Sequence, residues 1–165
     1  MKEKIKHYIK EISIFIVVMT IFANILSLYK STDLNKEPLT VSNFTLMDGS
    51  KYTFSNNKPV LIHIWATWCP TCKVEASNIQ TISKSYDVIT IAVKSGEYAE
   101  IQSWLNENSY DFNVVNDNTG LISSKFNIAA FPTTFIYDKD RNLIFSEVGY
   151  TSTLGLYLRM WWASL

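Results

Sequence analysis

The sequence has little that would attract a highly charged partner. Its fifteen Lys and Arg residues balance fifteen Asp and Glu residues, so the formal net charge is zero. A chain without net charge gives no electrostatic reason to expect nucleic acid or an anionic substrate. Phosphate-binding loops, nucleotide-binding fingerprints, a serine triad, internal repeats and low-complexity segments are also missing from the sequence. Composition and motifs therefore argue against nucleotide enzymes, serine hydrolases and nucleic-acid-binding proteins.

Cysteine is equally scarce, and the two cysteines that are present, Cys69 and Cys72, are separated by only Pro70 and Thr71. Two cysteines allow one disulfide or one pair of metal ligands. A disulfide that closes so short a loop contributes little as a structural staple. The spacing therefore favours thiol–disulfide chemistry over a structural bridge or a metal clip.

The Cys-Pro-Thr-Cys motif stands where a strand is expected to give way to a helix. The apolar run 59–64 before it predicts a buried strand, and the apolar spacing over 74–82 after it suits a helix. At a helix N-terminus, unpaired amides and the helix dipole stabilise a thiolate. We therefore predict that Cys69 is the exposed nucleophile and that Cys72 is the buried, resolving thiol.

A long apolar run occupies the N-terminus. Residues 12–29 carry no charge and are mostly Ile, Val, Phe and Leu. A run of this length falls within the roughly 17–25 residues that span a bilayer as a helix. Lysines precede the run, at Lys2, Lys4, Lys6 and Lys10. The positive-inside rule then predicts a cytoplasmic N-terminus.

These features predict a single-pass protein of the inner (cytoplasmic) membrane with its globular part in the periplasm. A cleaved signal peptide is the alternative, but no small-x-small cleavage pattern follows the apolar run. We expect a cytoplasmic segment (1–11), a transmembrane anchor (12–29), a polar linker (30–38) and one globular domain (39–165). Disulfides persist in that compartment, so partner proteins rather than glutathione would set the redox state of the motif.

At 165 residues the chain has room for one domain with a core. A hairpin is expected over 41–54, and strands over 60–65, 87–93, 112–115, 133–137 and 143–148. A turn or helix cap is expected over 116–120, followed by a brief helix over 121–126. Longer helices are expected after Cys69, from Tyr98, and after the cap Thr151-Ser152. This alternation predicts an α/β fold with a mixed sheet covered on both faces.

Aromatic residues recur toward the C-terminus. Leu154, Tyr157, Leu158 and Trp161 form one stripe of the expected last helix. We interpret the aromatic set Trp104, Tyr157, Trp161 and Trp162 as core rather than as a ligand cage.

The run Trp65–Cys72, in this order of elements, is similar to the thioredoxin-like superfamily. More narrowly, it resembles the membrane-anchored, extracytoplasmic thiol:disulfide oxidoreductases of the TlpA, ResA and DsbE type. Three further runs, 90–96, 114–117 and 149–152 with 158–163, are most similar to the suppressor-of-copper-sensitivity D (ScsD) type. The resemblance covers the chain from about residue 41 to the C-terminus.

This resemblance implies a thioredoxin fold with an N-terminal hairpin extension, and thiol–disulfide exchange through a Cys69–Cys72 disulfide. Its partners would be disulfide-bearing extracytoplasmic client proteins and a membrane thiol reductant of the DsbD or ScsB kind. We expect a monomer with neither a cofactor nor a metal.

The resemblance also assigns residues around the disulfide. Pro132 matches a cis-proline, and a cis bond would aim the backbone of the preceding residue at an incoming peptide strand. The alternative is a trans proline that opens an edge strand. Phe131 is bulkier than the residue common before that proline, and Thr133 follows it. Trp65 is expected to pack under the site and Trp68 to lie at its rim.

Two ionisable residues have open roles. Glu75 follows Cys72 by one helical turn and could hold the proton of Cys72, or could be a solvated carboxylate. His63 lies in the apolar strand before the motif, where burial would keep it neutral. It could accept a proton from Cys72, or it could be a core histidine bonded to backbone.

The favoured function is reduction of disulfides in periplasmic clients. A protein disulfide oxidant is one alternative. A Cu(I)-binding module that uses the two thiolates is another, because soft thiolate ligands select Cu(I).

Overall fold

The computed structural model describes residues 2–30, 34–41 and 43–165. Met1 of the predicted cytoplasmic segment, residues 31–33 of the predicted linker and residue 42 of the predicted hairpin lie outside the described residues.

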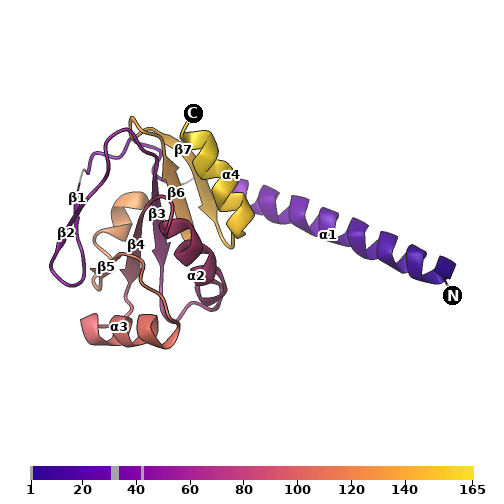
Figure 1. The fold of residues 1–165 in the computed structure, drawn as a ribbon, viewed down its shortest axis with the longest axis horizontal. Helices are drawn as coiled ribbons and strands as arrows, with labels where there is room; N and C mark the ends of the chain where they lie inside the picture. The colour runs from indigo at the N-terminus through magenta and orange to yellow at the C-terminus, as the bar shows by residue number, and fades with distance from the viewer. Residues whose placement is uncertain (1, 31–33, 42) are drawn as a thin grey trace.

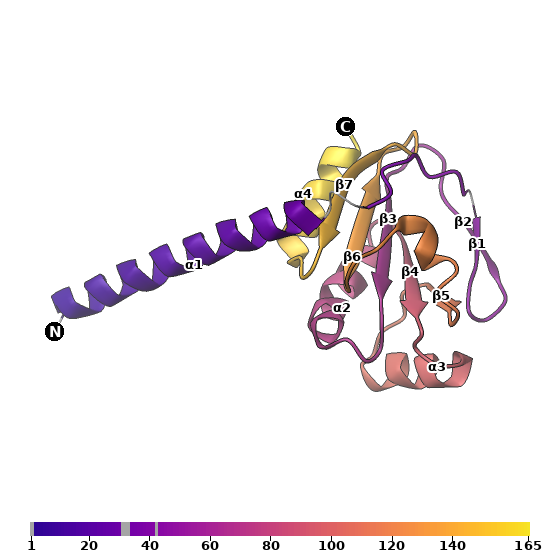
Figure 2. The same ribbon diagram turned by 180° about the vertical axis from the view of Figure 1, so that it is seen from behind.

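A 29-residue helix, α1 (Lys2–Lys30), projects from the globular part as a single rod (Figures 1 and 2). Its segment Lys6–Ser27 is long and apolar enough to cross a membrane, and the side chains described in that segment are not buried in the protein. The predicted anchor over 12–29 falls inside α1. The helix is therefore compatible with a single-pass membrane anchor.

The globular part is built on a five-stranded mixed sheet of order β5-β4-β3-β6-β7. Its strands are β3 (Val60–Trp65), β4 (Asp87–Val93), β5 (Val114–Asp117), β6 (Thr133–Tyr137) and β7 (Leu143–Val148). β3, β4 and β5 are parallel, while β6 and β7 are antiparallel to their neighbours. β3 is buried along its whole length because it lies in the middle of the sheet. The predicted α/β thioredoxin fold is confirmed.

Helices cover one face of the sheet. α2 (Pro70–Ser83), α3 (Tyr98–Glu107) and α4 (Thr153–Ala163) contribute to one apolar cluster with Leu61 and Trp65 of β3. On the other face, Ile62 and Ile64 pack in a second cluster with residues of the N-terminal hairpin. Successive strand residues point to opposite faces, so β3 supplies the centre of both clusters.

The hairpin extension consists of β1 (Asn43–Thr45) and β2 (Lys51–Thr53), paired antiparallel around Asp48-Gly49. Asp87 of β4 joins the hairpin to the sheet: it accepts hydrogen bonds from the Ser55 amide at 2.7 Å and from the Tyr52 hydroxyl at 3.2 Å. Burial and the nearby Asp87 carboxylate raise the pKa of Tyr52 to about 12.

Part of the predicted linker is attached to the domain. Leu34 is buried, and the Asn35 amide donates a hydrogen bond to the Phe126 carbonyl at 3.1 Å. The Leu39 amide likewise bonds to the Arg141 carbonyl at 2.9 Å. These contacts keep the end of α1 close to the sheet.

The predicted strand over 112–115 is shifted in the structure, where β5 covers Val114–Asp117. Asn116 and Asp117, which the sequence suggested as a turn, belong to the strand. The Asp117 carboxylate accepts the amide hydrogens of Ile122 and Ser123 at 3.1 and 2.7 Å and so fixes the chain that follows. The helix predicted over 121–126 is a short 3-10 helix, η2 (Ser123–Phe126).

The core assignment of the C-terminal aromatics was wrong for two of four residues. Trp161 and Trp162 are 54% and 61% exposed, whereas Trp104 and Tyr157 are partly buried against the helix-side cluster. The buried face of α4 carries Leu156, Met160 and Ala163 instead. α4 has apolar residues on both faces, and the stripe chosen from the sequence is the outward one.

Candidate active site

Cys69 caps the N-terminus of α2. Its backbone is extended, and its sulfur accepts a hydrogen bond from the Cys72 amide at 3.2 Å. Pro70 begins the helix, at a position where a missing amide hydrogen leaves no bond unmade. Pro70 and Thr71 are both exposed, so the loop between the sulfurs faces solvent.

Cys69 and Cys72 form a disulfide with their Cα atoms 5.2 Å apart. Cys69 is 5% exposed and Cys72 is 1% exposed. Cys69 is therefore the more accessible sulfur, as predicted, but in this oxidised form it is not openly exposed. Both sulfurs belong to the helix-side core cluster, and Phe131 packs against that cluster.

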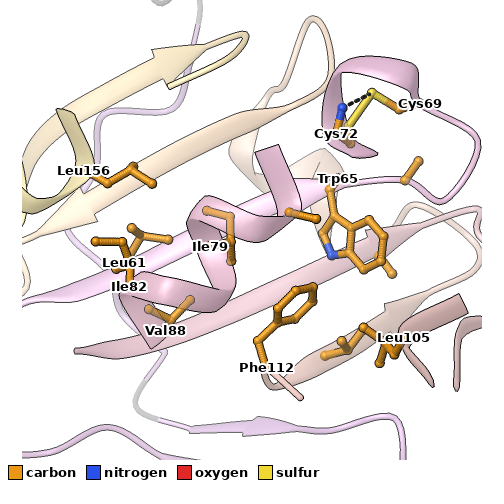
Figure 3. Close-up of a cluster of buried hydrophobic side chains, with 14 of the residues drawn as sticks. Leu61, Trp65, Cys69, Cys72, Ile79, Ile82, Val88, Leu105, Phe112 and Leu156 are labelled. Carbon is orange, nitrogen blue, oxygen red and sulfur yellow. Dashed lines mark hydrogen bonds between the residues drawn. A yellow bond between two sulfur atoms is a disulfide. The ribbon is translucent and has the colours of Figure 1, made fainter. Parts of the chain in front are cut away.

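Trp65 supports the disulfide from the end of β3. In Figure 3 its indole lies between the two cysteines and Phe112. It packs at right angles to Phe112, with 5.9 Å between ring centroids, and lies 4.8 Å from the ring of Trp104. Trp65 is buried, as the resemblance implies. These aromatic contacts attach the motif loop to the core.

The Phe131–Pro132 peptide bond is cis. The Pro132 carbonyl accepts a hydrogen bond from Gly149 at 2.8 Å. Thr133 begins β6, and its hydroxyl donates to the Ala130 carbonyl at 2.7 Å. The proline loop is thus held by one hydrogen bond within the loop and by one to Gly149, directly after β7.

Trp68 forms the rim of the site together with Phe131. Trp68 is 57% exposed, and its ring stands perpendicular to that of Phe131 with 5.5 Å between centroids. Its indole N–H donates to the Lys94 carbonyl at 3.0 Å. This pair links the motif loop to the proline loop, as expected for a rim tryptophan.

Glu75 is completely buried, which favours a role at the site over the solvated alternative. Its Oε1 accepts a hydrogen bond from the Thr151 amide at 3.2 Å, whereas Oε2 has no hydrogen-bond partner among the described residues. Burial raises the pKa of Glu75 to about 8; the Thr151 bond opposes the rise and the nearby Glu147 carboxylate adds to it. Near neutral pH the carboxyl group therefore carries a proton that it can exchange.

His63 is buried, and its Nδ1 lies 2.9 Å from the Thr134 hydroxyl oxygen. Burial lowers its pKa to about 3, so the imidazole is neutral. Within the described part of the chain this side chain bonds to Thr134 rather than to a cysteine. A catalytic role for His63 stays a prediction.

His63 belongs to a polar row that crosses the sheet. It is paired with Thr90 of β4 and Thr134 of β6, and Thr134 is paired with Glu147 of β7. Directly paired residues share a face of the sheet. Because side chains alternate along β3, this row lies on the face of Leu61 and Trp65, which the helices cover.

Sequence reasoning missed Glu147 and Arg159. The Arg159 guanidinium binds Glu147 Oε1 through Nη2 at 2.7 Å and through Nε at 2.9 Å. This ion pair joins α4 to β7 and neutralises the carboxylate that acts on Glu75. One signal was available: Arg159 is the only charged residue among residues 151–165.

Residues 39–146 match the model of the AhpC/TSA family. The chain is 33% identical over 132 residues to a thioredoxin-like protein of Haemophilus influenzae, a match that covers 76% of this chain and 78% of that protein. It is 31% identical over 98 residues to the thiol:disulfide interchange protein DsbE of Escherichia coli. That match covers 58% of this chain and 52% of DsbE, so the chain spans about half the length of this relative.

Solved structures agree in fold. StoA from Bacillus subtilis has a TM-score of 0.63 at 19% identity, covering 77% of this chain and 98% of StoA. A secreted disulfide oxidoreductase of Mycobacterium tuberculosis, described as homologous to Escherichia coli DsbE, has a TM-score of 0.61 at 22% identity. The match covers 72% of this chain and 92% of the Mycobacterium tuberculosis chain. The narrower resemblance to the ScsD type stays a prediction. The chain therefore belongs to the AhpC/TSA family and is a thiol:disulfide oxidoreductase of the thioredoxin-like type.

Proposed function

We propose that this protein reduces the disulfides of client proteins outside the cytoplasm, with Cys69 as nucleophile and Cys72 as resolving thiol. The supporting observation is the position of the Cys69 sulfur at the start of α2, where it accepts the Cys72 amide hydrogen at 3.2 Å. In the reduced protein the same amide and the helix dipole would stabilise the Cys69 thiolate.

The exchange proceeds in two steps. The Cys69 thiolate attacks a client disulfide, forms a mixed disulfide and releases one client sulfur as a thiolate. Cys72 loses its proton and attacks Cys69, which forms the Cys69–Cys72 bond and releases the second client sulfur. The client gains two electrons, which the two cysteines lose.

Glu75 exchanges the proton of Cys72. It lies one helical turn beyond Cys72, it is buried, and its Oε2 has no hydrogen-bond partner among the described residues. With a pKa of about 8, the carboxyl group is mainly protonated beside the disulfide at neutral pH. It would return this proton to Cys72 when a reductant opens the bond.

The cis-proline loop would position the client. Phe131 precedes Pro132, and its backbone is available to pair with an extended peptide as an added strand. The Trp68–Phe131 pair would give this groove an apolar rim.

The apolar run of α1 and the lysines in its first turns support a location on the outer side of the cytoplasmic membrane, with the N-terminus in the cytoplasm. There the reduced state needs a thiol donor, and a membrane reductant of the DsbD or ScsB kind has the required chemistry. We expect the clients to be proteins of the same compartment.

A trapping experiment tests the function. In a Cys72→Ala variant of the full-length chain the mixed disulfide cannot resolve, so clients should accumulate as adducts that thiol reagents release. Cys69→Ala is the matched control and should trap none. Equal adduct formation by both variants, or by neither, would contradict the assignment of Cys69 as nucleophile.

Redox equilibration tests the direction. A reductant should have a midpoint potential more negative than the glutathione poise of roughly −220 to −260 mV. A potential near that of DsbA, about −120 mV, would instead assign the protein as an oxidant.

A further inference from the structure

Helix α4 presents large apolar side chains outward. Four of them are more than half exposed: Leu154, Leu158, Trp161 and Trp162. Leu158 follows Leu154 by four residues and precedes Trp161 and Trp162 by three and four, so these side chains lie on one helix face. Leu156, Met160 and Ala163 occupy the opposite, buried face. We call the outward set the α4 outer face.

The other helices on this side of the sheet differ. The outward positions of α2 include Lys73, Ser77 and Thr81, and those of α3 include Glu100 and Glu107. The single charged residue of α4, Arg159, turns toward Glu147 and away from the outer face. A helix that is apolar on both faces is not suited to water, and a large exposed apolar patch marks an interaction site.

The apolar helix α1 leaves the domain next to α4 (Figures 1 and 2). The Val148 amide donates a hydrogen bond to the Ser27 hydroxyl at 3.0 Å, and that hydroxyl lies 3.4 Å from Glu147. At the domain end of α1, Asn24 lines an opening together with Tyr150, Gly155 and Arg159 of the domain. The side of α4 that carries Gly155 and Arg159 therefore faces α1, and the α4 outer face lies next to that side.

The chain between α1 and the domain is short. Only residues 31–33 separate Lys30 from the buried Leu34. Three residues reach about 10 Å when fully extended. Once α1 is inserted, the domain must therefore remain at the membrane surface.

We propose that the α4 outer face lies on the surface of the bilayer into which α1 inserts, with Trp161 and Trp162 at the level of the lipid headgroups. This inference rests on the proposed role of α1 as a membrane anchor. Tryptophan is enriched at that level because its ring is apolar and its N–H is polar. The absence of charge on the described outer face fits lipid better than a charged protein surface.

Docking through α4 would also orient the redox site. Thr151 immediately precedes the cap of α4, and its amide binds Glu75. The end of the domain that carries the disulfide would therefore keep a fixed position relative to the bilayer.

Quenching of tryptophan fluorescence tests the proposal in the full-length chain. All five tryptophans lie outside α1, so lipid quenching reports only on the domain. In phosphatidylcholine vesicles brominated along the acyl chains, we expect Trp161→Phe/Trp162→Phe to remove at least half of the quenchable fluorescence. Trp68→Phe, which removes a tryptophan of similar exposure, should leave the quenching in place. Equal quenching in both variants would overturn the proposal.

A charge substitution supplies a second readout. Leu158→Glu should reduce quenching by brominated lipid at least twofold, whereas Val74→Glu, at an exposed apolar position of α2, should not. Unchanged quenching in Leu158→Glu would contradict docking. A second copy of the chain could cover the α4 outer face instead. In that case brominated lipid would not quench Trp161 and Trp162, and in detergent their protection from acrylamide would increase with protein concentration. That result would overturn the proposal.

Alkaline carbonate extraction distinguishes a failure of the α4 docking from a failure of the α1 anchor. Protein that remains in the vesicles while acrylamide quenches Trp161 and Trp162 freely would overturn only the docking of α4. Protein that washes out would overturn the anchor itself, and the docking with it.

Discussion

Burial keeps two ionisable side chains of the domain, Glu75 and His63, neutral near pH 7. The pKa of Glu75 rises to about 8 and that of His63 falls to about 3, because burial disfavours the charged form of each. The sequence located both residues from their distances to Cys72 and Cys69. It could not supply their partners Thr151 and Thr134, which are brought near only by the fold.

Replacing Glu75 should slow disulfide exchange. We expect Glu75→Gln to lower the rate of insulin reduction at pH 7 at least tenfold, since general acid–base groups typically contribute about 10²-fold or more. The rate should also lose its dependence on pH around pH 8. Stopped-flow assays from pH 6 to 9 measure both effects.

The matched control is Glu107→Gln, an exposed carboxylate on α3, which should leave the rate and its pH profile unchanged. His63→Phe tests the other proton acceptor. Exchange rates in His63→Phe that equal those of the unsubstituted protein at each pH from 6 to 8 would remove the imidazole from the mechanism.

Glu75 should also make the stability of the oxidised protein depend on pH. Its folded pKa of about 8 exceeds the ordinary value of 4.5, so the folded state binds the proton more tightly. The free energy of unfolding should therefore fall as pH rises from about 4.5 to 8 and level off above pH 8. A shift of this size corresponds to a decrease on the order of 5 kcal/mol.

Urea unfolding of the oxidised protein and of Glu75→Gln across this range isolates the contribution. The difference in unfolding free energy between the two proteins should change with pH in the predicted direction. A difference that stays constant from pH 4.5 to 8 would show that Glu75 titrates as it does in water.

At the scale of the elements, α4 connects the site to the rest of the sheet. It packs against α2 through its buried face, its cap Ser152 accepts the Gly155 amide hydrogen at 3.2 Å, and Arg159 binds Glu147 of β7. The sequence predicted the cap of α4 correctly. It chose the wrong face as core, because periodicity alone cannot rank two apolar faces of one helix.

Among the strands, the sequence predicted those with a clear apolar pattern and misplaced one that tertiary contacts determine. The continuous apolar runs of β3 and β4 and the two halves of the β6–β7 hairpin were predicted at their observed bounds. β5 was misplaced because Asn116 and Asp117 are typical turn residues. Here the Asn116 amide group bonds to the Gly96 carbonyl at 3.0 Å and Asp117 caps the segment after the strand, so tertiary contacts override the local preference.

Arg159→Met should weaken the attachment of α4. The guanidinium makes two short contacts with Glu147 and one with the Gly155 carbonyl at 3.1 Å, and hydrogen bonds to charged groups contribute roughly 1.5–3 kcal/mol. Since the pair is partly exposed, we expect a loss of about 1–2 kcal/mol in urea unfolding.

Arg159→Met should also change the pH dependence of disulfide exchange. Without the guanidinium, the charge of Glu147 acts more strongly on Glu75, so the pH profile of exchange should move to higher pH. Arg159→Lys should recover part of the shift, because it restores the charge. An Arg159→Met variant that loses stability with an unmoved pH profile would limit Arg159 to a structural role.

At the scale of the whole molecule, one apolar rod carries one redox domain (Figure 1). The sequence predicted both parts, because a long apolar run and a Cys-x-x-C motif each have a strong local signature. It placed a polar linker over 30–38 between them, and in the structure Leu34 and Asn35 of that segment pack onto the domain.

Membrane topology gives a prediction at this scale. In cells whose outer membrane has been permeabilised and whose disulfides have been reduced, a membrane-impermeant maleimide should label Cys69 while the inner membrane is intact. The Cys69→Ala/Cys72→Ala variant gives the background. Labelling that requires disruption of the inner membrane would place the domain in the cytoplasm.

The most direct test is the titration of the Cys69 thiol in the full-length chain. The Cys72→Ala variant leaves Cys69 as the single thiol, and its rate of alkylation is measured as a function of pH. The hydrogen bond to the start of α2 predicts a pKa at least about one unit below the 8.5 of free cysteine, together with catalysed insulin reduction by the protein with both cysteines. A thiol that titrates near 8.5, in a protein that does not reduce insulin, would contradict the account.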